Sequence, residues 1–211
     1  GRSLEGCEVK PGQFFILRFL DKQRWWQAHP FSLSCAPNGQ YLRITVKNLG
    51  DYTSRMRELG PGTRVVVDGP HGVFTPETAV TNKFLLIAGG IGLTPILSMA
   101  QALAKNNQDM VLLRGARTGQ DLIMADELEQ IFKDKPDAKH DVVSQDQAGS
   151  GERGSIDLET VPYTHLRAHE TPEHLVCRHL LEKKKPHTNL TKYRFTTQHI
   201  STSSSLPITH S

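Results

Sequence analysis

The stretch FLLIAGGIGLTP, residues 84–95, decides how the second half of this chain folds. Apolar residues typical of a buried parallel strand come first, and the run then breaks on three glycines. Thr94 as N-cap and Pro95 as first helical residue predict that a helix begins there. Glycines at a strand end let the backbone approach a pyrophosphate, and the start of a helix directs free N–H groups at it. The pattern predicts a nucleotide-binding turn made of Gly89, Gly90, Ile91, Gly92, Thr94 and Pro95.

This turn is not the GxGxxG fingerprint of classical dehydrogenases. Pro95 stands where the third glycine would be, and no acidic residue ends the following strand, 110–115, to bind a ribose 2′-OH. The alternation around the turn nevertheless predicts a parallel α/β domain. Its expected elements are strands at 84–88, 110–115 and 141–144 and helices at 95–105 and 121–132. In the first helix, Ile96, Met99, Ala100 and Leu103 fall at helical spacing and are expected in the core.

The first half of the chain has a different pattern. Short β-rich runs, FFILRF, FSLS, LRITVK and RVVVDG, alternate with turns rich in glycine, proline and asparagine. Such a pattern predicts a small antiparallel β-barrel. The segment YTSRMREL, 52–59, is the one amphipathic helix expected in it.

Composition sets looser limits. A chain of 211 residues with 37% hydrophobic content and a formal charge of +3 suits two small domains. Basic residues are scattered among acidic ones, which argues against a nucleic-acid partner. Cys7, Cys35 and Cys177 have no metal or disulfide spacing, so we expect no metal site and a reducing compartment. No apolar run is long enough to span a bilayer.

Five motifs in order carry a resemblance to a known family. They are PGQFF (11–15), HPFS (29–32), ITVKNLGDYT (44–53), GPHGVF (69–74) and GGIGLTP (89–95). Together they resemble the ferredoxin-NADP reductase superfamily, and HPFS is similar to its ferric reductase and NADPH oxidase branch. Within that branch the chain looks like the reductase half of bacterial ferric reductase-like membrane proteins. The resemblance implies an FAD-binding antiparallel β-barrel at 1–79 and a parallel-sheet NAD(P)-binding domain at 82–161. The first strand of the barrel and the C-terminal half of the nucleotide domain are expected to be missing.

The resemblance also implies roles for individual residues. Phe31 would pack on the flavin, and Ser32, the expected catalytic residue, would hydrogen-bond near flavin N5. His29, in place of the family's arginine, would contact the ribityl or phosphate groups, and the turn before a short helix would bind the FAD pyrophosphate. The nicotinamide nucleotide, NADPH or NADH, would lie on the glycine turn. The full set of cofactor-binding residues expected outside that turn is His29, Pro30, Phe31, Ser32, Val46, Lys47, Gly50, Asp51, Thr53, Arg117 and Ser144.

The resemblance implies that hydride passes from NAD(P)H to FAD and that electrons then leave singly for a haem or ferric acceptor. The acceptor would be an upstream membrane haem domain or a small iron–sulfur or ferric acceptor, and the parent protein would lie on the cytoplasmic side of a bacterial membrane. Two alternatives stay open: a soluble reductase component of an oxygenase, and an inactive fragment that only binds flavin or nucleotide. Because the chain starts without Met directly before PGQFF, we expect it to be a fragment.

The segment 162–211 differs from everything before it. It holds seven of the ten histidines and none of the seventeen glycines, and we expect no strand or helix in it. A histidine-rich metal tail and a disordered linker are two interpretations. The third is a foreign sequence, because YTHLRAHET (163–171) resembles a translated sequencing adapter and HLVCRHLLEKKK (174–185) resembles its continuation into poly-A. On the third interpretation the tail takes no part in the site.

Overall fold

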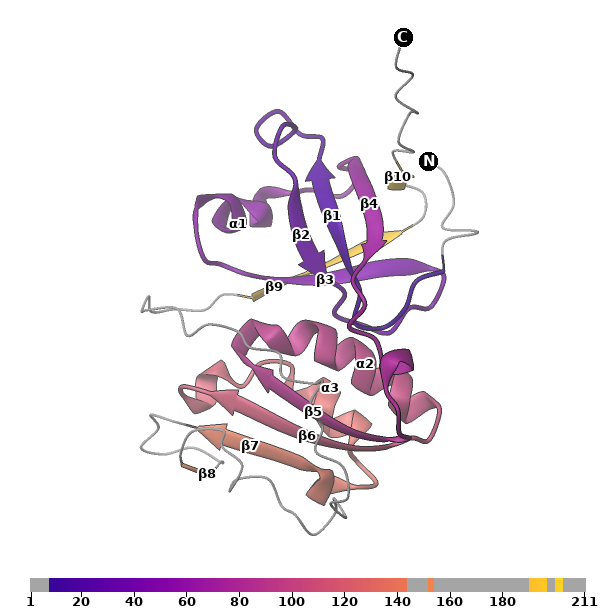
Figure 1. The fold of residues 1–211 in the computed structure, drawn as a ribbon. Coiled ribbons are helices and arrows are strands. Elements are labelled where there is room, and N and C mark those ends of the chain that lie inside the picture. Colours follow the sequence, from indigo (N-terminus) through magenta and orange to yellow (C-terminus); the bar gives the residue numbers. More distant parts are fainter. Residues whose placement is uncertain (1–7, 144–151, 154–189, 197–199, 203–211) are drawn as a thin grey trace.

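The computed structural model describes residues 8–143, 152–153, 190–196 and 200–202. The chain forms two consecutive regions, an antiparallel sheet region and a parallel α/β region (Figure 1). The first region contains β1 (Phe14–Phe19), β2 (His29–Ser32), β3 (Tyr41–Lys47), α1 (Asp51–Arg55), η1 (Met56–Glu58), β4 (Val65–His71) and η2 (Pro76–Thr78). The second contains β5 (Lys83–Gly89), η3 (Gly90–Gly92), α2 (Leu93–Lys105), β6 (Asp109–Ala116), η4 (Gly119–Asp121), α3 (Ala125–Ile131), η5 (Pro136–Ala138), β7 (Lys139–Val143) and β8 (Glu152–Arg153).

The first region follows the predicted strand pattern. β1 pairs antiparallel with both β2 and β4, and an isolated bridge between Leu33 and Ile44 joins β2 to β3. Along β1 every second side chain, Phe15, Leu17 and Phe19, is buried in the core, as the period of two requires. The antiparallel sheet predicted for this half is therefore confirmed.

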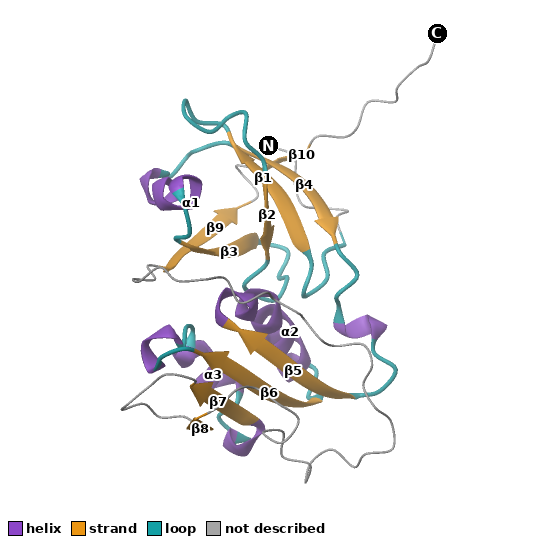
Figure 2. Ribbon diagram, turned by 60° about the vertical axis from the view of Figure 1, so that its left-hand side comes forward, coloured by secondary structure: helices purple, strands orange, loops and turns teal. Residues whose placement is uncertain are grey.

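The second region is the predicted parallel sheet. β5, β6, β7 and β8 lie in this order and pair in parallel, with β5 at the edge of the described sheet. Helix α2 packs on β5 and β6 and lies between the sheet and the first region (Figures 1 and 2). Its residues predicted for the core are all buried: Ile96, Met99, Ala100 and Leu103.

Three boundaries differ from the prediction. The helix expected at 52–59 is split into α1 and η1, and the helix expected at 121–132 begins only at Ala125, after η4. Helix α2 begins at Leu93 rather than at Pro95, because the glycine turn winds directly into it as η3.

Two strands lie in the segment for which we expected none. β9 (Leu190–Thr196) pairs antiparallel with the whole of β3, and β10 (Ile200–Thr202) pairs in parallel with β4. The expectation was wrong for these two stretches, because the alternation of Thr191, Tyr193 and Phe195 with Lys192 and Arg194 is a strand period. The histidines between 165 and 187 lie outside the described residues.

Candidate functional site

The first candidate site lies where β2 meets α1. The ring of His29, at the start of β2, lies on the ring of Tyr52 in α1, with ring centroids 3.9 Å apart and planes inclined by 40°. Phe31 and Ser32 follow on the same strand, and Phe31 is half-buried against the core of the first region. The motif HPFS and the motif GDYT, far apart in sequence, are thus brought together.

Tyr52 is a site residue that the sequence reasoning missed. Its hydroxyl is buried and has no hydrogen-bond partner among the described residues, and burial raises the pKa of this phenol to about 12. A buried hydroxyl ordinarily has a partner, so an unsatisfied one beside His29 fits a ligand that offers polar groups. Tyr52 stands inside the GDYT motif, but nothing in that motif indicates that the hydroxyl is buried beside His29.

The turn that opens α1 is shaped for an anion. The first intrahelical hydrogen bond runs from Ser54 N to Gly50 O (2.8 Å), so the N–H groups of Asp51 to Thr53 precede the helical ladder. A Cβ atom placed on Gly50 would meet nothing within 4 Å, so the space beside the turn is open. The Thr53 hydroxyl is occupied within the turn, where it accepts from the N–H groups of Leu49 (2.9 Å) and Gly50 (3.1 Å).

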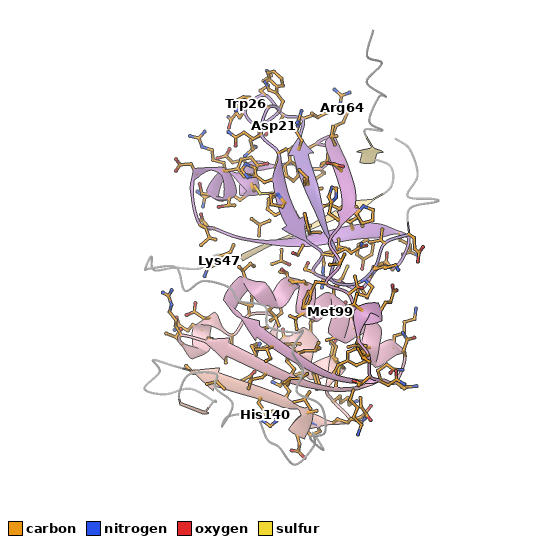
Figure 3. The ribbon with its side chains drawn as sticks, viewed as in Figure 1. Asp21, Trp26, Lys47, Arg64, Met99 and His140 are labelled. Atoms are coloured by element: carbon orange, nitrogen blue, oxygen red, sulfur yellow. The ribbon has the colours of Figure 1, made fainter. Side chains whose placement is uncertain are left out.

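The end of β3 offers fewer side chains for cofactor binding than we expected. Val46 is buried in the core and lies opposite Thr191 of β9, whereas Lys47 is half-buried at the end of the strand (Figure 3). Pro30 is exposed on β2.

The glycine turn after β5 forms the second candidate site. Gly90 has a φ of +51°, a conformation that glycine adopts without strain. Cβ atoms placed on Gly89, Gly90 or Gly92 would meet nothing within 4 Å, so the turn leaves open space where a phosphate could approach the backbone. The residues present therefore fit a dinucleotide pyrophosphate.

The predicted capping role of Thr94 is wrong. Gly92 occupies the N-cap position of α2, and the buried Thr94 hydroxyl donates to Ile91 O at 3.0 Å. Pro95 is the third helical residue. Because the helix begins two residues early, its free N–H groups come from the turn itself, which keeps them beside the open space.

Arg117 and Ser144 were expected at the ribose end of the nucleotide. β5 and β6 end at the same edge of the sheet, where Gly89 pairs with Gly115, and the exposed Arg117 follows directly after β6. Arg117 is thus on the edge that carries the glycine turn, as ligand-binding residues are in such sheets. Ser144 lies outside the described residues.

A buried ion pair behind this edge was not foreseen. Arg114 on β6 is 3% exposed and binds Asp141 on β7 through both ends of its guanidinium, Nε to Oδ1 at 2.8 Å and Nη2 to Oδ2 at 2.6 Å. Its Nη1 also donates to the carbonyl of Ile123, before α3 (2.8 Å). Burial alone would raise the pKa of Asp141, but the hydrogen bonds and charges of Arg114 and Lys139 outweigh it and hold the pKa below its usual value. An arginine within the apolar run MVLLRGA is the signal for such a partner.

Three polar contacts fix the two regions against each other. Ser98 on α2 donates to Cys35 O (2.8 Å), and Gln101 on α2 accepts from Ala36 N (2.8 Å). Arg43 on β3 forms an ion pair with Glu127 on α3 (2.6 Å). These contacts set how the two candidate sites sit relative to each other.

Among the described residues no group of three or more His, Cys, Asp or Glu side chains is placed to hold a metal ion. None of the helices in the described part of the chain is long and apolar enough to cross a membrane.

An antiparallel domain with an open turn before α1 is followed by a parallel domain with a glycine turn, and two family models identify this pair as an FAD-binding and an NAD-binding domain. Residues 2–75 match the family model described as FAD-binding domain, and residues 86–182 match the one described as oxidoreductase NAD-binding domain. The second match runs past residue 161, where we expected the domain to stop. The chain belongs to the ferredoxin reductase-like superfamily, a family of FAD-dependent NAD(P)H oxidoreductases.

Individual relatives support this family assignment. The chain is 35% identical over 150 residues to the glycine betaine monooxygenase reductase subunit of Chromohalobacter salexigens, covering 68% of this chain and 40% of that protein. It is 33% identical over 143 residues to a flavohemoprotein of Rhizobium meliloti, covering 63% of this chain and 36% of that protein. The chain therefore spans about two fifths of the length of these relatives.

A solved structure has the same fold. It is the flavohem-like FAD/NAD-binding domain of nitric oxide dioxygenase from Vibrio cholerae, with a TM-score of 0.63 and 21% identity, covering 74% of this chain and 69% of that one.

Proposed function

We propose that this chain is the reductase part of an electron-transfer protein that takes hydride from NADH or NADPH and passes electrons singly to a separate acceptor. FAD, when bound, supplies the change from two-electron to one-electron chemistry. The observation that carries the proposal is the pair of anion-binding turns, each with open space beside it, on two domains that α2 joins.

The residues of the first domain bind and orient the flavin. Phe31 provides an apolar surface for the ring system, and the Ser32 hydroxyl donates or accepts a hydrogen bond near the reacting nitrogen. His29 and Tyr52 hold the polar chain that links the ring to the pyrophosphate, which satisfies the Tyr52 hydroxyl. The N–H groups from Asp51 to Thr53 bind the pyrophosphate.

The second domain binds the nicotinamide nucleotide. The turn from Gly89 to Pro95 holds its pyrophosphate, and Arg117 and Ser144 bind the ribose end. Hydride transfer requires the nicotinamide and flavin rings in contact, and the contacts between the domains would hold the two binding turns in a fixed arrangement for it.

For the acceptor, we propose a haem or ferric centre, as in the ferric reductase and NADPH oxidase branch. HPFS at 29–32 supports this branch. On this proposal the protein works at the cytoplasmic side of a bacterial membrane, joined to a membrane haem domain.

Flavin binding gives the first test. The purified chain should retain or take up FAD, with altered flavin fluorescence, and Phe31→Ala should weaken the binding. A folded protein that binds no flavin contradicts the proposal. NADH oxidation with ferricyanide, measured on the complete protein, then separates a working reductase from a protein that only binds flavin or nucleotide.

The similarity to a monooxygenase reductase subunit favours a second candidate, a soluble reductase component of an oxygenase. Natural DNA upstream of the coding sequence distinguishes the two. Transmembrane helices encoded there exclude the oxygenase component, and an iron–sulfur domain encoded in the same frame supports it.

A further inference from the structure

Two tryptophans stand exposed on the loop between β1 and β2. Trp25 is 59% exposed and Trp26 is 56% exposed, with their rings edge to face at a centroid distance of 5.9 Å. Neither side chain belongs to the core of the first region. Leu20, on the same loop, is also exposed. Figure 3 shows Trp26 at the end of the first region that is remote from the nucleotide domain.

One buried arginine anchors the loop that carries the two tryptophans. Arg24 is 5% exposed, its Nε donates to Asp21 Oδ2 and its backbone N–H to Asp21 Oδ1, each at 2.7 Å. Its Nη1 donates to the carbonyl of Arg55 at the end of α1. The indoles are therefore presented to solvent by a fixed loop, and a partner would bind them without first ordering the chain.

The charge around the indoles is mostly positive. Five exposed cations lie on this loop and on the elements beside it, and none of them forms an ion pair with another described residue: Arg18, Lys22, Arg55, Arg57 and Arg64. The carboxylates nearby are Asp21, which is paired with Arg24, and the exposed Glu58 and Asp51. Figure 3 places Trp26, Asp21 and Arg64 at the same end of the domain.

We propose that this loop, with the exposed side chains of Leu20, Trp25 and Trp26 and the surrounding cations, docks the protein on an anionic phospholipid surface. Indole rings concentrate at the interface between hydrocarbon and water, where the ring is buried and its N–H stays wet. Exposed lysines and arginines are attracted to anionic headgroups. A protein interface covers about 20–30 residues on each side, whereas the exposed large apolar side chains here are three on one loop. This shape favours insertion into a bilayer surface over a protein partner.

The chain reports on this loop directly, because Trp25 and Trp26 are its only two tryptophans. The full chain is mixed with vesicles of phosphatidylcholine containing about 30 mol% phosphatidylserine, at low salt, and followed by tryptophan emission and by sedimentation. We expect the emission to move to shorter wavelength and the protein to sediment with the vesicles. Pure phosphatidylcholine vesicles, or salt raised to about 0.5 M, should weaken the binding.

Substitutions test whether the loop between β1 and β2 causes the vesicle binding. Trp25→Ala with Trp26→Ala should lower the vesicle partition coefficient by about tenfold or more, and Lys22→Glu should lower it on anionic vesicles only. Val73→Ala with Val80→Ala, two exposed apolar positions elsewhere, is the matched control and should leave partitioning unchanged. FAD content checks that each variant is folded, so a failure of flavin binding is distinguishable from a failure of docking.

Absence of sedimentation and of any emission shift with anionic vesicles overturns the proposal and leaves the tryptophans to a protein partner. Equal partitioning of the wild type and the double tryptophan variant also overturns it.

Discussion

The buried ion pair between Arg114 and Asp141 gives the sharpest prediction for stability. Asp141→Asn removes the charge that compensates a guanidinium of 3% exposure and disrupts two charge-assisted hydrogen bonds of 2.8 and 2.6 Å. The bond from Arg114 to Ile123 O remains, but it does not neutralise the charge. Leaving a buried charge without its partner costs about 3–5 kcal/mol, a large fraction of the stability of a small domain.

The chain offers a matched control for this substitution. Asp109, at the start of β6, pairs with Lys135 at 2.8 Å, but both side chains are about two thirds exposed. Asp109→Asn should therefore cost about 1 kcal/mol or less. Arg114→Met combined with Asp141→Leu replaces the pair by apolar groups of similar size and should recover most of the loss.

Urea unfolding measures all four proteins. The helical signal in circular dichroism comes mainly from the nucleotide domain, because the two longest described helices, α2 and α3, lie there. Tryptophan emission reports on the first domain, because both tryptophans lie between β1 and β2. The Asp141→Asn transition in circular dichroism should move to lower urea. A loss no larger than that of Asp109→Asn would refute the reasoning, because the guanidinium would then be adequately solvated without its partner.

The same pair predicts how stability depends on pH. The pKa of Asp141 is lower in the folded protein than in the unfolded chain. The unfolded state therefore binds more protons at acidic pH, and the contribution of the carboxylate is complete above about pH 4 and is lost as the pH falls through the folded pKa. Comparing unfolding of the wild type and Asp141→Asn from pH 7 to pH 3 should show their difference shrinking on the acid side. A difference that grows with acidity contradicts this sign.

Three further predictions concern coupling, cofactor and tail. The ion pair between Arg43 and Glu127 joins the two domains. Glu127→Gln should therefore separate the unfolding transitions seen by circular dichroism and by tryptophan emission. Transitions that stay coincident would show that this pair does not couple the unfolding of the two domains. The enzyme should not strongly prefer NADPH, because a neutral glutamine, Gln145, follows Ser144 where related enzymes selective for the 2′-phosphate commonly have arginine. A kcat/KM ratio above about tenfold in favour of NADPH, or ~1.4 kcal/mol, measured on the complete protein, contradicts this. Residues from about 162 onward should prove foreign, and natural DNA that continues through Ser211 with these codons would disprove this. This chain should also show little NAD(P)H-driven turnover.

Much of the fold could be predicted from local pattern. The period of two along β1 and the helical spacing in α2 each depend on neighbouring residues, so the sequence determines them directly. The glycine turn was placed correctly for the same reason. The start of α2 was not, because Thr94 satisfies the capping rule locally while its hydroxyl bonds to Ile91 O inside a turn that is already winding.

Contacts between distant residues could not be predicted in the same way. Arg114 and Asp141 are 27 positions apart and meet only because β6 and β7 are neighbours in register, with Arg114 opposite Asp141. The sequence indicates that a buried arginine needs a carboxylate, but several carboxylates precede Asp141 after β6. The correct carboxylate can be chosen only when the register of β6 against β7 is known. That register depends on how the segment between the two strands packs, and it cannot be derived from the residues of β6 alone. For the same reason Tyr52 was overlooked: its hydroxyl becomes a candidate ligand contact only when α1 places it over His29, where nothing in the described chain satisfies it.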